Sequence, residues 1–202
     1  QLACSSDENI LFFGWPSAFR TDSNGLSASL SGAIEIYDRS GNNFTNIGIV
    51  SSGYYLSGTD EGDAIGRFFG NEIACSDDGT YLYSLSIQPG NGSEQYPNGK
   101  LHLFKRESNI YSEVSSDILD SPVEPSNYLQ WSLACDSSGS KVLAGEGQFS
   151  GNGQGYVHYY ARVGDNITRV GFATAGVLRD SNGLDVATYG WSVDLSGSGE
   201  VG

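Results

Sequence analysis

Acidic residues gathered in three short polar segments are the most obvious candidates for chemistry in this sequence. One segment is Asp60-Glu61-Gly62-Asp63, and the tetrapeptide Asp-Ser-Asn-Gly occurs at 22–25 and again at 180–183. Oxygen ligands of this kind suit Ca²⁺, but a calcium site needs about six to eight of them. Asp and Asn also favour turns through local hydrogen bonds, which explains the tetrapeptides more simply. We therefore predict no cofactor, with calcium as the alternative.

The two histidines form no recognisable catalytic group. His102 and His158 each alternate with apolar residues, as in Leu101-His102-Leu103, and this alternation is typical of β-strands. A nucleophilic mechanism needs a base that is paired with a nucleophile and oriented by a third group, and the chain suggests no such pairing. We predict that both histidines lie on sheet faces and that the chain is not an enzyme.

An enzymatic function is nevertheless the main alternative. Ser76-Asp77-Asp78-Gly79-Thr80-Tyr81 is similar to the Asp-box of sialidase-like propellers, Ser-x-Asp-x-Gly-x-Thr-Trp, although it is one residue shorter. Glycosidases need paired carboxylates and usually arginines that orient the sugar, whereas the ten Lys and Arg residues form no cluster. The alternative hypothesis is thus part of a sialidase-like propeller glycoside hydrolase.

Three asparagines begin Asn-x-Ser/Thr sequons, namely Asn43, Asn91 and Asn166. Asn43 and Asn166 fall in the same predicted turn of two repeated units. Turns favour asparagine in any case, so two interpretations stay open: a turn residue, or an N-glycosylation site in a secreted protein.

Composition limits the classes of partner. The 202 residues carry a net charge of −14 and include 28 Gly and no Met. An acidic chain without basic patches is a poor partner for nucleic acid or anionic lipid. No run of about 18 apolar residues predicts a membrane span. The many Tyr, Ser, Asn and Gly residues are typical of an extracellular protein, or of one on the surface of a cell, appendage or virion.

A repeated hairpin must position all of these residues. Between 131 and 147, two short strands flank the turn Ser137-Ser138-Gly139, and similar hairpins begin near residues 1, 71 and 191. A near-constant spacing of this kind indicates a repeat array. One column holds Cys4, Cys75, Cys135 and Leu195. Because a column that accepts leucine is an apolar position, we predict that the three cysteines are buried, reduced and unligated.

Each unit is predicted to contain four short antiparallel strands. In the unit from 71 to 130 we place them at 71–76, 81–87, 100–105 and 110–118. No helical periodicity of useful length occurs. Small sheets that repeat at a fixed spacing predict an all-β fold of β-propeller blades. Trp131 and Trp191, on the first strands of their units, are expected to pack between adjacent blades.

The repeated motifs resemble FG-GAP repeats. An aromatic-glycine pair precedes the first strand of a unit, and a glycine motif ends the second. The copies are Phe69-Gly70, Tyr189-Gly190, Gly14-Trp15-Pro16 and Gly145-Glu146-Gly147, with degenerate copies at Leu129-Gln130 and Leu85-Ser86-Ile87. The resemblance covers the whole chain and implies a seven-bladed propeller like that of integrin α subunits. It implies adhesion, ligand binding or structural assembly, but the calcium loops of integrin type are missing from the corresponding turns.

The domain organisation follows from the repeat. We predict units at 1–70, 71–130 and 131–190, with a further unit starting at 191–202, so that residues 1–202 form about three blades of a larger propeller. Both ends fall inside a predicted hairpin. We therefore expect the remaining blades to belong to a longer chain within a larger surface protein.

Function is predicted to lie in the long loops. The connections within the first–second and third–fourth strand pairs are short, whereas the others are long and varied, and long loops on a rigid scaffold commonly carry binding residues. Tyrosines with acidic neighbours suit a protein or glycan partner, or a neighbouring subunit. The alternative is that these loops only cover sheet edges. The candidate binding residues are Phe19, Asp22, Tyr54, Tyr55, Asp60, Glu61, Asp63, Tyr96, Tyr128 and Phe149.

Overall fold

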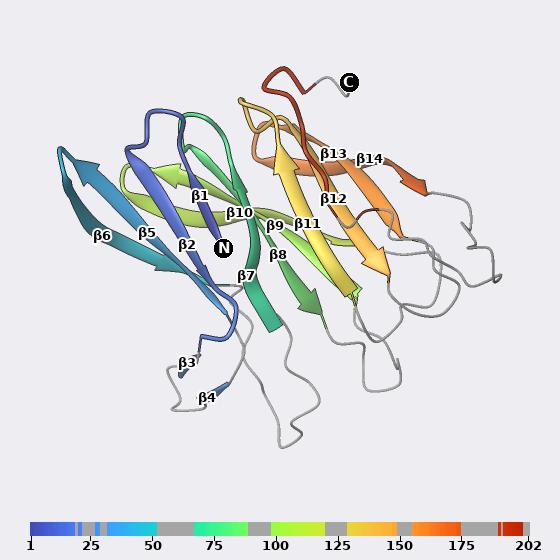
Figure 1. The fold of residues 1–202 in the computed structure, drawn as a ribbon, viewed down its shortest axis with the longest axis horizontal. Coiled ribbons are helices and arrows are strands. Elements are labelled where there is room, and N and C mark those ends of the chain that lie inside the picture. The colour runs from blue at the N-terminus through green and yellow to red at the C-terminus, as the bar shows by residue number, and fades with distance from the viewer. Residues whose placement is uncertain are drawn as a thin grey trace, which may run out of the picture.

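The computed structural model is built from β-strands and turns. It describes residues 1–18, 20–21, 27–28, 32–51, 67–88, 98–119, 129–148, 155–174, 190 and 192–199, and no helix occurs among them. Three four-stranded antiparallel sheets contain most of the strands (Figure 1). The prediction of an all-β chain with four antiparallel strands per unit is therefore confirmed.

Each sheet is a simple meander in chain order. The first sheet contains β1 (Leu2–Cys4), β2 (Ile10–Trp15), β5 (Ala33–Ser40) and β6 (Asn43–Val50). The second contains β7 (Arg67–Cys75), β8 (Tyr81–Gln88), β9 (Asn98–Glu107) and β10 (Ile110–Leu119). The third contains β11 (Leu129–Cys135), β12 (Lys141–Gln148), β13 (Tyr156–Val163) and β14 (Asn166–Thr174). A small hairpin of β3 (Arg20–Thr21) and β4 (Ser27–Ala28), which the sequence did not predict, lies between β2 and β5.

The sheets pack face to face and share two hydrophobic clusters. Alternation along β9 explains how one sheet serves both: Phe104 joins the cluster shared with the first sheet, and Leu101 and Leu103 join the cluster shared with the third. Both leucines are fully buried. Burial of one such side chain stabilises the fold by roughly 1.5–3 kcal/mol. The two-residue period of a strand thus fixes which side chains meet which neighbour.

Glycines allow the backbones of adjacent sheets to approach closely. A Cβ at Gly14 would overlap the carbonyl oxygen of Gly70, and a Cβ at Gly145 would overlap that of Gly190. Gly70 and Gly190 also have positive φ angles of 82° and 79°, which L side chains rarely adopt. The two halves of the repeated glycine motif therefore face each other between the first and second sheets, and again between the third sheet and Gly190.

The boundary between the second and third sheets is built differently. Leu85 stands there at the position of Gly14 and Gly145, and the indole of Trp131 packs directly over Gly99. Trp131 is only 6 % exposed and belongs to the cluster between these two sheets. Its predicted place between adjacent sheets is confirmed, whereas the side chain of Trp191 lies outside the described residues.

A β-bulge recurs at one position of all three sheets. The register shifts by one residue between the third and fourth strands, which places Ile47, Val114 and Val170 outside the regular pairing. Bulges bend a strand and increase its twist. The fourth strand of each sheet is therefore bent at the same level, a feature that apolar alternation alone did not predict.

The outer face of the first sheet is open. Leu2 pairs with Phe13, and Ile49 lies in the same row beyond Glu35. Leu2, Phe13 and Ile49 are 55 %, 38 % and 52 % exposed. Ile73 occupies the position of Leu2 in the second sheet, where the first sheet covers it to 4 % exposure. The same face is therefore covered in one sheet and open in another.

Candidate functional site

The predicted binding loops lie outside the described residues. This applies to Phe19, Asp22, Tyr54, Tyr55, Asp60, Glu61, Asp63, Tyr96, Tyr128 and Phe149, and to the sequon at Asn91. The described strand ends place the bases of these loops at one end of the sheets. Trp15 pairs with Ala33 there, and Gln88 pairs with Asn98. We call this end of the sheets the long-loop end. The opposite end, where the turns between β1 and β2, β7 and β8, and β11 and β12 lie, is called the short-turn end (Figure 1).

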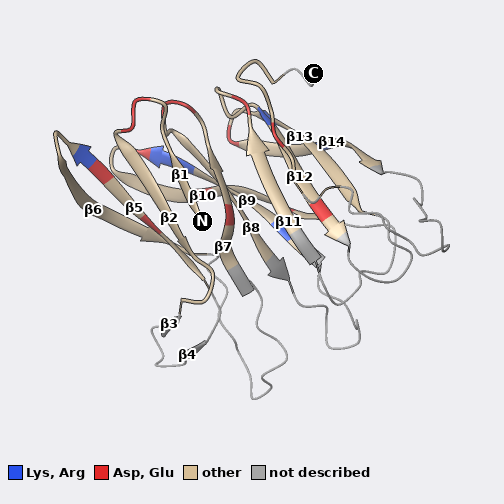
Figure 2. Ribbon diagram, in the orientation of Figure 1, with Lys and Arg blue, Asp and Glu red and all other residues tan. Residues whose placement is uncertain are grey.

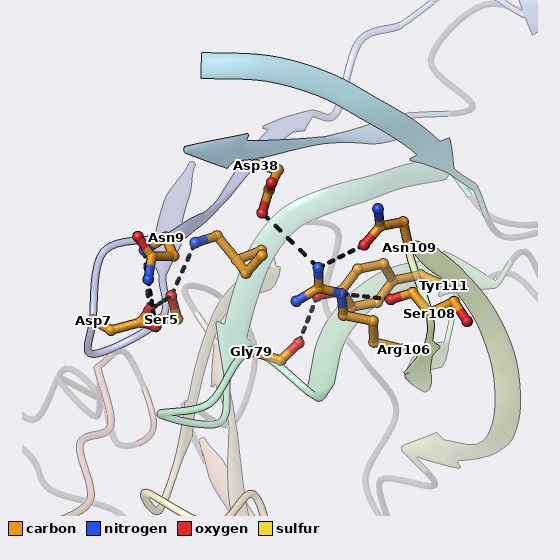
Figure 3. A network of polar contacts seen from close by, with 10 residues as sticks. Ser5, Asp7, Asn9, Asp38, Gly79, Arg106, Ser108, Asn109 and Tyr111 are labelled. Carbon is orange, nitrogen blue, oxygen red and sulfur yellow. Dashed lines mark hydrogen bonds and ion pairs between the residues drawn. The ribbon is translucent and has the colours of Figure 1, made fainter. Parts of the chain in front are cut away.

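The turn between β1 and β2 is closed by a network of side chains (Figure 3). Ser5 donates its hydroxyl hydrogen to Asp7 at 2.6 Å and accepts from the backbone N–H of Ile10 at 3.0 Å. Asp7 also accepts from both the backbone and the side chain of Asn9. The hydrogen bond from Ser5, joined by those from Asn9, lowers the pKa of Asp7. The carboxylate therefore stabilises the turn and stays charged.

The same network recurs in the next two sheets. Ser76 donates to Asp78 at 2.6 Å, and Asp78 accepts from Thr80. In the third sheet the two residue types are exchanged, because Asp136 stands at the position of Ser76 and accepts from Ser138 at 2.9 Å. A Ser–Asp hydrogen bond is thus kept while its direction along the chain is reversed.

Backbone hydrogen bonds join these turns into a ladder across the sheets. Ser6 donates its N–H to the carbonyl of Asp77 at 2.7 Å, and Asp77 donates to Ser137 at 2.8 Å. Ser137 then donates to Gly197 at 3.1 Å. These four residues occupy the same place in successive hairpins, spaced 71, 60 and 60 residues apart. Repeat-equivalent residues of neighbouring units are therefore in direct contact.

Arginines at equivalent positions of the three sheets, which the sequence did not predict, stabilise the turns at the short-turn end. Arg39, Arg106 and Arg162 each donate to a carbonyl of the following turn at 2.8–2.9 Å. The guanidinium of Arg162 also lies 3.5 Å from the ring centroid of Tyr81 on the second sheet. Arg106 reaches within 3.9 Å of Asp38 on the first sheet (Figure 3). Unequal loops shift the spacing of these arginines away from that of the cysteines, which concealed their equivalence.

Two tyrosine hydroxyls reach turn carbonyls, from alternative positions. Tyr111 donates to the carbonyl of Gly79 at 2.5 Å (Figure 3). Its ring packs edge-on against Phe12. Tyr83, which occupies the position of Phe12, donates to Gly139 at 2.5 Å. In the third sheet the position of Tyr111 is apolar, because Ile167 fills it. The first of these bonds lies within the second sheet, and the second joins the second sheet to the third.

Three residues of the second sheet form a hydrogen-bonded series with the geometry of a catalytic triad. Ser86 Oγ lies 2.7 Å from His102 Nε2, and His102 Nδ1 lies 3.1 Å from Glu113 Oε1. When Nδ1–H donates to the carboxylate, Nε2 accepts from the serine. The prediction that no nucleophile–base pair exists is therefore wrong. Polar residues at alternate positions of neighbouring strands, such as Ser86 and Lys100, were the signal for this cluster.

Because Ser86 and His102 are shielded from solvent, their hydrogen bonds have a structural role. Ser86 is 2 % exposed and His102 is fully buried, with Phe69 packed edge-on at 5.3 Å from the imidazole. A substrate carbonyl has no approach to Ser86 in this arrangement. Burial lowers the pKa of His102, although Glu113 opposes this effect. The histidine is therefore neutral at pH 7 and links its own strand, β9, to β8 and β10. Its predicted place on a sheet face is confirmed.

His158 repeats the arrangement with another partner. Its Nε2 lies 3.3 Å from Glu146, which is 4 % exposed and occupies the position of Ser86. No hydroxyl takes the place of a nucleophile in this pair. His158 is also fully buried on a sheet face, as predicted.

The cysteines occupy equivalent positions in the first strands of the three sheets. Cys75 Sγ lies 3.1 Å from the carbonyl oxygen of Cys4, not from its thiol. A disulfide needs facing Cβ atoms, so this arrangement leaves all three thiols free. The prediction that all are buried is wrong: Cys4 is exposed on the open face of the first sheet, and Cys75 and Cys135 are half-buried.

Charges of both signs lie near the short turns (Figure 2). Within the described part of the chain, no group of three or more His, Cys, Asp or Glu side chains is placed to hold a metal ion. The acidic segments at 22–25, 60–63 and 180–183 fall outside that part. No helix among the described residues is long and apolar enough to cross a membrane.

Comparison with known proteins leaves the family undetermined. No family model matches the chain, and no curated protein matches it. The resemblance to FG-GAP repeats therefore depends on the motifs in this sequence.

Proposed function

We propose that the chain is a segment of a β-propeller of FG-GAP type that serves binding or assembly and has no catalytic role. The hydrogen-bonded ladder from Ser6 through Asp77 and Ser137 to Gly197 carries this proposal. Equivalent residues meet in this way when similar sheets are stacked with a constant relation to one another. The open outer face of the first sheet fits the same proposal, since a further blade would cover it.

The binding surface is assigned to the long-loop end. At the short-turn end, many polar groups already serve the fold: carboxylates close turns, arginines donate to turn carbonyls, and turn tips pair with one another. A group that is already hydrogen-bonded offers less to a partner, because binding must replace that bond. We therefore assign partner binding to the side chains of the long loops.

The composition of these loops favours a protein or glycan partner, or neighbouring subunits of an assembly. Tyrosine offers a rigid aromatic surface with a hydrogen-bonding tip. Acidic neighbours and the net charge of −14 disfavour nucleic acid. Such a surface suits an adhesive, receptor-like or structural protein outside the cell, or on a cell, appendage or virion.

One observation favours the alternative, part of a sialidase-like glycoside hydrolase. The turn from Ser76 to Tyr81 resembles an Asp-box, and Asp78 in it accepts from both the backbone and the side chain of Thr80. The only nucleophile–base pair among the described residues is sealed from solvent. Hydrolysis of a fluorogenic sialoside, if it were abolished by Asp-to-Asn replacements in the long loops, would favour this alternative.

The experiment that tests the proposal replaces Tyr54, Tyr55 and Tyr96 together by serine. Binding is measured on a glycan array and on intact cells, with Ile110→Ser at the short-turn end as the control, because Ile110 is 69 % exposed. We expect the triple variant to lose binding and the control to keep it. Binding that survives the triple change and is lost on Ile110→Ser would show that the partner binds at the short-turn end, and would contradict the proposal.

A further inference from the structure

Two of the sequons occupy the same exposed position in different sheets. Asn43 is the first residue of β6 and pairs with Ser40 across a two-residue turn. Asn166 is the first residue of β14 and pairs with Val163 across an equivalent turn. Both asparagines are exposed. In the second sheet this place is taken by Ile110, which does not begin a sequon.

The turns do not need these asparagines. Gly41 and Gly164 supply the positive φ angles, 63° and 62°, that a tight turn requires. Arg39 donates to the carbonyl of Gly41 and Arg162 to that of Gly164, each at 2.8 Å. Turn closure is thus complete without the asparagine side chain.

Other asparagines of the chain show what turn chemistry looks like here. Asn9 donates to Asp7, Asn46 accepts from the N–H of Gly48, and Asn109 accepts from Arg106. The side-chain amides of Asn43 and Asn166 make no hydrogen bond within the described part of the chain. The simple explanation of these two residues as turn formers therefore fails.

Strand geometry presents each sequon in an accessible form. Residues i and i+2 of a strand share one side, so Asn166 and Thr168 lie on the same side and are both exposed. Ile167 between them is 9 % exposed and faces the core. Asn43 and Thr45 are likewise both exposed. The folded sheets thus leave room for a group attached to either asparagine.

We propose that Asn43 and Asn166 are acceptor sites for N-linked oligosaccharides. In this step Nδ2 of the asparagine forms a bond to the anomeric carbon of an oligosaccharide carried on a lipid pyrophosphate. The bond between that carbon and the pyrophosphate oxygen breaks, the lipid pyrophosphate leaves, and the amide gives up one proton. The glycans would extend from the short-turn end of the first and third sheets. This inference is independent of the binding role assigned to the long loops.

The test is expression of the chain through the secretory pathway of a eukaryotic cell, followed by intact-mass analysis and peptide mapping. We expect glycan on the peptides of Asn43 and Asn166, removed by peptide N-glycosidase with conversion of each asparagine to aspartate. Asn43→Gln and Asn166→Gln should each remove one glycan, whereas the matched control Asn46→Gln should remove none.

Thr45→Ala and Thr168→Ala provide a second pair of variants, because they destroy each sequon and keep the asparagine. They should abolish modification of Asn43 and Asn166 respectively. Secreted protein in which both peptides are unmodified, or carries glycan at Asn91 alone, would overturn the proposal. Modification at one of the two positions would overturn it for the other.

Discussion

Replacement of Trp131 by alanine tests the packing between the second and third sheets. The indole is 6 % exposed and fills the space above Gly99. A buried tryptophan removes on the order of 200 Å² from water, and at about 25 cal/mol per Å² this burial contributes roughly 5 kcal/mol as an upper estimate. The indole N–H makes no hydrogen bond, so its loss adds no further cost. We expect Trp131→Ala to lower the free energy of unfolding by about 3–5 kcal/mol.

The assay is urea denaturation followed by circular dichroism. Two variants make the result specific. Trp131→Phe keeps much of the volume and removes the unpartnered N–H, so it should cost less than the alanine change by at least about 1.5 kcal/mol. Trp15→Ala, at a side chain that is 53 % exposed, should change stability by less than about 1 kcal/mol. A loss below about 1 kcal/mol for Trp131→Ala would refute the proposed packing of these two sheets.

Three further predictions concern glycine, a carboxylate and the thiols. Gly145→Ala should destabilise the fold by about 1–3 kcal/mol, because the new methyl group overlaps the carbonyl of Gly190, whereas Gly171→Ala meets open space and should be nearly neutral. Burial raises the pKa of Glu72 to about 7 from 4.5, so the stability that this group contributes is present below pH 4.5 and is lost as pH rises through 7. Glu72→Gln should therefore flatten the fall in melting temperature between pH 5 and 8. An unchanged fall would contradict the raised pKa. Cys4, which is exposed, should react with a maleimide at pH 7 well before Cys75, whose pKa burial raises to about 12; equal rates would contradict this difference in burial.

The strands were predictable because they obey one simple rule. In the second sheet, the predicted strands at 81–87, 100–105 and 110–118 lie within β8, β9 and β10. The strands β8 and β9 alternate apolar residues that face a neighbouring sheet, and each of the three strands is bounded by Gly, Asn or Asp at a turn. The first strand was predicted too short, since β7 starts at Arg67 and includes Phe69-Gly70. These two residues belong to the strand because they pack on the first sheet, a contact that local pattern cannot reveal.

Features that depend on strand pairing or on the relation between sheets escaped prediction. Cys4 follows the same local pattern as Cys75, yet it is exposed because none of the sheets that the structure describes covers its side of the first sheet. The bulges at Ile47, Val114 and Val170 arise from strand pairing and leave no distinct residue signature. The Ser86–His102–Glu113 chain joins three strands, so its members are far apart in sequence and meet only when the sheet forms.

Hydrogen exchange of individual amides, measured by NMR, tests most directly the claim that repeat-equivalent residues join successive sheets. The amides of Ser6, Asp77 and Ser137 lie at turn tips and donate to the next turn. We predict that they exchange at least about tenfold more slowly than the amide of Asn42, a turn residue without such a bond in the described part of the chain, which corresponds to about 1.4 kcal/mol of protection. Equal exchange rates at all four positions would contradict the stacked repeat and, with it, the propeller proposal.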